Sequence, residues 1–139
     1  MKKRLVYLIL PVITLILEII PYGAVLYFGR ATEDGGTAVR ELFSYFDLIP
    51  FGYANFAPLI TAVFTCICVL FIVRYCISVK NKTVIAARNL CLVTAVINLC
   101  PLFYGVRYLS LVGILISISL VAEAWLLTKF IKEAEVIEV

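Results

Sequence analysis

The stretch LILEIIPYG, residues 15–23, places a carboxylate, Glu18, inside an otherwise unbroken apolar run. A related stretch, VINLCPLFYG, covers residues 96–105 and carries Asn98 at the corresponding place. A charged group in the middle of a membrane helix costs about 3 kcal/mol on insertion scales, so such residues usually face a partner in the protein interior. The two stretches therefore predict membrane helices whose polar positions point into a shared core.

Composition favours a lipid bilayer over water as the surroundings of the chain. Of its 139 residues, 64% are hydrophobic and 15% are charged, and the mean hydropathy is +1.10. A water-soluble domain of this size needs a larger polar share to cover its surface. The net charge of +3 comes without the basic, aromatic-rich patch of nucleic-acid-binding proteins, so we expect no nucleic-acid partner.

Four weakly charged runs are each close to the roughly 20 residues that a helix needs to cross hydrocarbon. They cover about residues 5–27, 57–77, 87–104 and 108–128. The sequence thus predicts an all-α, polytopic membrane protein with one four-helix domain over residues 1–139. Very few residues separate the last two runs, so we expect them to form a tight antiparallel pair.

The distribution of lysine and arginine predicts that both termini are cytoplasmic. With the N-terminus inside, nine basic residues lie on the inner side and three on the outer side. The inner residues are Lys2, Lys3, Arg4, Arg74, Lys80, Lys82, Arg88, Lys129 and Lys132, and the outer residues are Arg30, Arg40 and Arg107. No small-x-small cleavage motif follows the first apolar run, so we expect a retained signal anchor.

A long outer loop, residues 28–56, separates the first two predicted spans. Val39, Leu42, Phe43 and Phe46 recur in it at i, i+3, i+4 and i+7, which predicts a short amphipathic helix lying on the membrane surface. The loop has two interpretations. It is a cap that closes the outer end of the bundle, or it is a lid or partner-binding surface.

Two polar stripes repeat the same 3, 4, 3 spacing on the first and third spans, which puts each stripe on one helix face. The first contains Pro11, Thr14, Glu18 and Pro21, and the second contains Cys91, Thr94, Asn98 and Pro101. The match suggests either a duplicated two-helix hairpin of the kind found in transporters, or a shared need for proline kinks at Pro21 and Pro101.

If the stripes face each other, Glu18 hydrogen-bonds Asn98, with Thr14 and Thr94 beside them as further groups of a binding site. Burial disfavours the charged form of a carboxyl, so Glu18 is a candidate proton site. The alternative is a neutral glutamic acid that joins two helices, a bond worth about 0.6–2 kcal/mol.

Glu123 lies near the cytoplasmic end of the fourth span, at the same level as Arg74 and Arg88. We expect ion pairing or water contact among these three residues at the inner interface.

The sequence predicts no enzyme, no cofactor and no metal site. Histidine, the commonest metal ligand and general base, is absent. Five cysteines lie in or beside apolar runs without a C-x-x-C motif, and we interpret them as small packing residues. They are Cys66, Cys68, Cys76, Cys91 and Cys100.

Four spans with a glutamate in the first helix make the layout similar to that of the small multidrug resistance transporters. That resemblance implies that Glu18 binds protons and cations and that two subunits form the pore. The chain departs from the family in its long outer loop and in a third span without glycine before Gly105. No continuous motif is shared, so the resemblance assigns no family.

The sequence therefore predicts a non-enzymatic packing or interaction subunit of a bacterial-type cytoplasmic membrane. Its partners are the lipid bilayer and either a second copy of the chain or another membrane protein. The alternative is a proton-coupled or cation-binding small transporter that uses Glu18.

Overall fold

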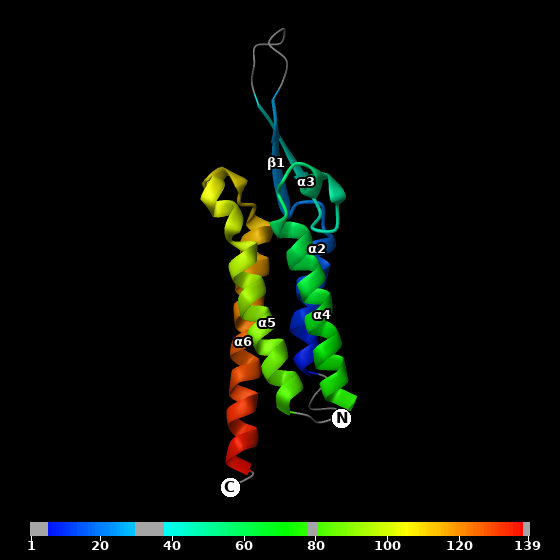
Figure 1. The fold of residues 1–139 in the computed structure, drawn as a ribbon, viewed down its shortest axis with the longest axis vertical. Helices are drawn as coiled ribbons and strands as arrows, with labels where there is room; N and C mark the ends of the chain where they lie inside the picture. Colours follow the sequence, from blue (N-terminus) through cyan, green and yellow to red (C-terminus); the bar gives the residue numbers. More distant parts are fainter. Residues whose placement is uncertain (1–5, 30–37, 78–80, 138–139) are drawn as a thin grey trace.

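A computed structural model describes the backbone of residues 6–29, 38–77 and 81–137 and the side chains of residues 6–29, 38–77 and 82–131. Three long helices run side by side: α4 (Ala57–Ile77), α5 (Asn81–Asn98) and α6 (Leu111–Ile137). A shorter helix, α2 (Ile9–Ile19), follows the 3-10 turn η1 (Val6–Leu8) and completes the bundle by packing against α4 and α6. The fold is mostly helical, as expected for an all-α membrane protein (Figure 1).

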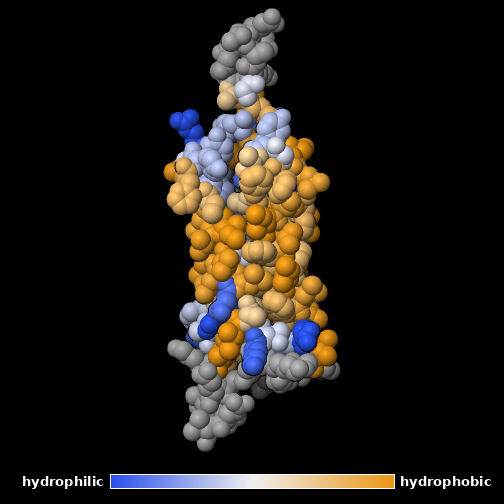
Figure 2. All heavy atoms as spheres, in the orientation of Figure 1, coloured by the Kyte–Doolittle hydropathy of each residue, from blue (hydrophilic) through white to orange (hydrophobic). Residues whose placement is uncertain are grey.

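The three long helical segments are each long and apolar enough to cross a membrane. They cover Ala57–Ile77, Lys82–Tyr104 and Leu111–Ile131, and the first apolar segment, Val6–Ile19, is shorter. Figure 2 shows a hydrophobic belt around the middle of the bundle with more hydrophilic residues towards both ends. These three segments support a membrane protein, and a fourth crossing at residues 5–27 stays a prediction.

Pro21 and Pro101 each lie just after the end of an α-helix, so the predicted kinks at these two prolines are wrong. Ile20, directly after α2, is extended at ψ 132°, which is the conformation that a following proline favours. Pro101 is the second residue of the 3-10 helix η3 (Cys100–Tyr104), which follows the end of α5 at Asn98. Proline lacks the N–H that would continue the helical ladder, and its ring clashes with the preceding turn.

A β-hairpin rises from one end of the bundle, which we call the hairpin end; α2 begins and α6 ends at the opposite end, the terminal end (Figure 1). Strand β1 (Ala24–Phe28) pairs antiparallel with β2 (Val39–Phe43), with Ala24 opposite Phe43 and Phe28 opposite Val39. The sequence Gly35-Gly36 predicts a turn here, but residues 30–37 lie outside the described residues.

The predicted amphipathic helix over Val39–Phe46 is therefore wrong, because most of this segment is a strand. So short a helix is marginal by itself. Residues 24–28, at the end of the first apolar run, can pair with residues 39–43 because the helix before them has already ended ahead of Pro21. The loop's helix is α3 (Leu48–Gly52), and it leads into α4.

The last connection is compact, as the sequence predicts. After η3 comes the turn η4 (Val106–Tyr108), and α6 begins three residues later. Two apolar clusters fill the bundle. One near the terminal end is built around Cys68, Ile72 and Ala87, and the other near the hairpin end is built around Tyr45, Ile116 and Leu120.

Candidate functional site

The bundle interior carries a series of buried polar side chains. The predicted residues Glu18, Thr14, Asn98, Thr94 and Glu123 are all buried, as expected for intramembrane polar groups that face a protein core. Their partners, however, differ from the predicted ones.

Glu18 is 0% exposed and contacts α4 through the hydroxyl of Thr65, whose Oγ1 lies 2.7 Å from Glu18 Oε1. The same Oγ1 lies 3.0 Å from the carbonyl oxygen of Thr61. The Thr65 hydroxyl has one hydrogen and can donate to only one of these two oxygens. Both hydrogen bonds form only if the Glu18 carboxyl is protonated and donates to Thr65 Oγ1 while Thr65 donates to Thr61 O. The geometry thus favours a neutral Glu18 that joins α2 to α4.

Two polar atoms in this region have no hydrogen-bond partner among the described residues: Glu18 Oε2 and Thr61 Oγ1. Both belong to the contact between α2 and α4. Unpaired buried oxygens of this kind mark a position where a water or a proton donor would be accommodated.

Among the described residues, the hydrogen-bond partners of Thr14 and Thr94 are groups other than Glu18 and Asn98. Thr14 Oγ1 donates to Leu10 O of its own helix at 3.0 Å, so Ser119, 2.6 Å away on α6, donates to Thr14. Thr94 donates to Leu90 O of its own helix at 2.7 Å. Thr14 thus connects α2 to α6, whereas the hydroxyl of Thr94 bonds within α5.

Asn98 makes three hydrogen bonds through its side-chain amide. Its Oδ1 accepts a 2.6 Å hydrogen bond from the Tyr45 hydroxyl. Its Nδ2 donates to Gly113 O at 2.9 Å and to Ser117 Oγ at 2.7 Å. Both amide hydrogens are therefore used, and one side chain connects α5, α6 and the segment that follows β2.

The predicted hydrogen bond between Glu18 and Asn98 is not among the hydrogen bonds of the described residues. Tyr45 links the two positions instead. Its N–H donates to Glu18 O at 2.9 Å, while its hydroxyl binds Asn98. The carbonyl of Glu18 lies in the last turn of α2, where carbonyls lose their helical partners, so the Tyr45 N–H satisfies an otherwise unpaired acceptor.

Two glycines make the space that Tyr45 occupies. A Cβ on Gly23 would lie 2.7 Å from the Tyr45 ring, and a Cβ on Gly113 would lie 3.1 Å from its hydroxyl. Ser110 Oγ also donates to Gly23 O across this contact. Burial raises the pKa of the Tyr45 phenol, which stays protonated and able to donate to Asn98.

Replacing Gly23 with alanine is expected to lower the free energy of unfolding by about 1–3 kcal/mol, because the new methyl group forces the buried Tyr45 ring out of its position. Thermal unfolding in detergent micelles measures the effect. Gly29→Ala is the matched control on the same hairpin, because nothing lies within 4 Å of its Cβ position. Equal stabilities for the two variants would show that Tyr45 is not tightly held.

Glu123 is not at an interface with arginines, so the predicted ion pairing is wrong for the described residues. Its side chain is 2% exposed between α5 and α6, and Cys91 Sγ donates to Glu123 Oε1 at 3.2 Å. Arg74 is exposed, and Arg88 donates to Asn89 Oδ1 through Nε and Nη2. The arginines sit on the outer surface of the bundle, where water or lipid headgroups solvate them.

Cavities open at the hairpin end. One of about 530 Å³ is lined by Tyr27, Ala38 and residues 104–108, and one of about 290 Å³ lies between residues 54–60 and 97–104. A third, of about 220 Å³, adjoins Leu26 and Tyr53. Glu18 lines none of these three, and its carboxyl lies in a packed helix contact.

Comparison with models of protein families, with curated proteins and with solved structures finds no match to the chain. The functional assignment therefore depends on the geometry of the chain itself. Sequence reasoning missed Tyr45, Thr65 and Ser119 as partners, because each contributes a common residue type whose role depends on distant segments meeting.

Proposed function

We propose that this chain is a non-enzymatic interaction subunit of a cytoplasmic membrane, whose helical bundle holds the β-hairpin in a fixed position on the outer side. The observation that carries the proposal is the hydrogen bonding of Asn98. Its amide uses its donors to bind α6 and its acceptor to bind Tyr45. The buried polar groups of this region thus fasten elements together.

Further contacts support the base of the hairpin. The Tyr27 hydroxyl donates to Arg107 O at 3.2 Å, and its ring packs edge-on against Tyr108. Phe28 packs against Phe43 and Tyr53. An isolated two-stranded hairpin is marginally stable at best, so these contacts supply the stability that its own backbone pairing lacks.

The proposed topology has four crossings with both termini cytoplasmic. Segments η1 and α2 together extend about 22 Å, short of the roughly 30 Å of hydrocarbon. The extended residues 24–26 are buried in the protein and add about 10 Å. Non-helical backbone at membrane depth is tolerated where protein covers it, so the first run can still cross.

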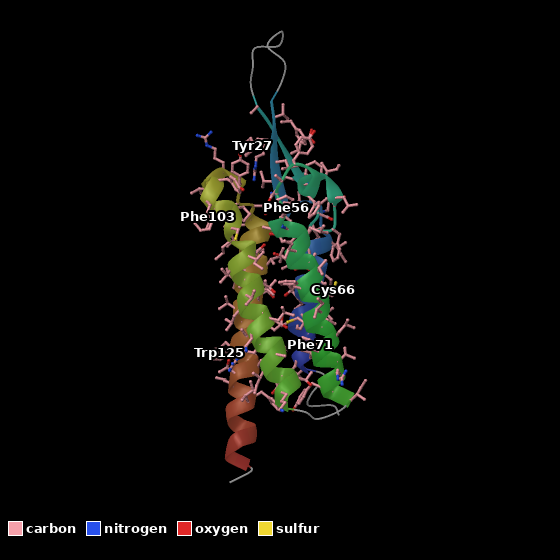
Figure 3. All side chains as sticks on the ribbon, in the orientation of Figure 1. Tyr27, Phe56, Cys66, Phe71, Phe103 and Trp125 are labelled. Carbon is pink, nitrogen blue, oxygen red and sulfur yellow. The ribbon has the colours of Figure 1, made fainter. Side chains whose placement is uncertain are left out.

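Aromatic residues near both ends fit this placement (Figure 3). Tyr27 and Phe56 lie towards the hairpin end, whereas Trp125 lies near the terminal end, where Lys129 Nζ is 3.9 Å from its ring centroid. Tyrosine and tryptophan are enriched at membrane interfaces. The apolar faces between them contact lipid, and the hairpin is left to contact a second copy or another membrane protein.

A photoreactive amino acid at Glu41, exposed on β2, is expected to form protein adducts in native membranes. The same probe at Leu70, exposed on the apolar surface of α4, is expected to react mainly with lipid. Mass spectrometry of adducts, with differently tagged copies of the chain, separates self-association from a second protein. Lipid-only or solvent-only products from both positions would contradict an interaction role for the hairpin.

One observation favours a second function, a proton-coupled or cation-binding transporter. Glu18 Oε2 and Thr61 Oγ1 are buried without partners, and a transported proton or cation would use such atoms. Asn98 and Thr94 are already engaged elsewhere, so this second function would depend on Glu18 with Thr61 and Thr65.

A further inference from the structure

Three helices each place one metal-ligating side chain at the same point of the apolar cluster near the terminal end. Cys68 comes from α4, Cys91 from α5 and Glu123 from α6, and their ligand atoms all lie within 4.8 Å of one another. The two sulfurs are 2.9 Å apart, and Cys91 Sγ is 3.2 Å from Glu123 Oε1. This group could not be predicted from the sequence, because its three residues lie far apart in the chain on separate helices.

The surroundings are otherwise apolar, and the one backbone contact of the group is the Cys68 thiol, which donates to Ala87 O at 3.2 Å among the described residues. Ile72, Val84, Ala87 and Leu127 form the buried cluster around it. The second carboxyl oxygen, Glu123 Oε2, is buried and has no hydrogen-bond partner among the described residues. A buried carboxyl oxygen without a partner is costly, and coordination to a cation would satisfy it.

We propose that Cys68, Cys91 and Glu123 bind one thiophilic metal ion of the Zn²⁺ type. Thiolate is a soft ligand that selects zinc and cuprous ions, whereas Mg²⁺ and Ca²⁺ require sets of oxygen ligands. Two thiolates and one carboxylate leave a fourth tetrahedral position, which water or a second carboxylate oxygen fills. The proposal is independent of the interaction role of the hairpin.

The geometry needs only a small adjustment to receive the ion. At the usual zinc–ligand lengths, tetrahedral sulfurs lie about 3.8 Å apart, and sulfur and oxygen lie about 3.5 Å apart. The two sulfurs would therefore separate by somewhat less than 1 Å, and Cys91 Sγ and Glu123 Oε1 by less than that. The third pair of ligand atoms already lies within 4.8 Å. Both thiols release their protons to the solvent on binding, and the dipositive ion offsets most of the negative charge that the three ligands bring into the core.

The test loads the full-length reduced protein with Co²⁺ during reconstitution into detergent micelles, because the ligands are buried. We expect one Co²⁺ per chain, thiolate-to-cobalt charge-transfer absorption of two-sulfur intensity, and displacement by Zn²⁺. Zn²⁺ should also raise the melting temperature of the wild-type protein. Loss of a group that hydrogen-bonds a metal ligand weakens metal binding by roughly 10–100-fold. Loss of a ligand itself should weaken Co²⁺ binding by more than this in each of the variants Cys68→Ser, Cys91→Ser and Glu123→Gln.

Matched controls separate this site from general cysteine chemistry. Cys66→Ser, two residues from Cys68 on α4, and Cys100→Ser should bind like the wild-type protein. If Glu123→Gln does not fold, Glu123→Asp keeps the carboxylate and should retain weakened binding. Absent charge-transfer absorption in folded, reduced protein would overturn the proposal. Equal losses from Cys66→Ser would also overturn it.

Discussion

Replacing Asn98 with leucine is expected to lower the free energy of unfolding by about 2–3 kcal/mol, from three buried hydrogen bonds at roughly 0.6–1 kcal/mol each. The change removes the acceptor of Tyr45 and the donor to Gly113 O and Ser117. Because these groups are buried, each loses its partner without gaining water. The hairpin base and α6 should loosen together.

Denaturation in mixed detergent micelles, followed by circular dichroism, measures this loss. Asn89→Leu is the matched control on the same helix, because Asn89 is exposed and hydrogen-bonds only the neighbouring Arg88 among the described side chains. It should change stability by less than about 0.5 kcal/mol. Asn98→Leu with near wild-type stability would remove the main support for the proposed role of the bundle.

Glu18→Lys is expected to destabilise the protein by about 3 kcal/mol or to prevent its insertion, since it puts a cation at a fully buried position of the bundle. Glu18→Gln should cost less than about 1 kcal/mol, because the glutamine amide can still hydrogen-bond the Thr65 hydroxyl. The substitution removes only the ionisable carboxyl group. Unfolding measurements on purified variants test both values.

Proton flux separates the two proposed functions at this residue. In proteoliposomes with an imposed pH gradient, an interaction subunit should show the same background flux for wild type and Glu18→Gln. A transporter should show flux that Glu18→Gln abolishes while the protein stays folded, and that result would favour the second function. Thr65→Val is the companion variant, because it removes the hydroxyl from Glu18 at nearly constant volume.

Membrane character and the inward-facing polar positions could be predicted from local patterns. Apolar length and low charge indicated the three long helices, with ends displaced by a few residues. The energetic cost of Glu18 and Asn98 in hydrocarbon was enough to predict that they are buried. Pro21 and Pro101 correctly indicated where the regular helices are interrupted, but the helices end there and do not kink.

The strand at Val39–Phe43 could not be predicted from its own residues, because a 3–4 spacing over so few positions also fits a strand. Its state depends on Ala24–Phe28, which offers backbone partners only once Pro21 has ended α2. A non-local pairing of this kind overrides local periodicity.

The sequence by itself predicted a membrane protein and the burial of Glu18 and Asn98 within its apolar runs, since both follow from the transfer free energies of single residues and runs. Only the tertiary structure decided which polar groups meet. Tyr45 links Glu18 to Asn98, and Cys68, Cys91 and Glu123 converge from three helices. Helix rotation and loop path set these pairings, and both result from the packing of the whole bundle.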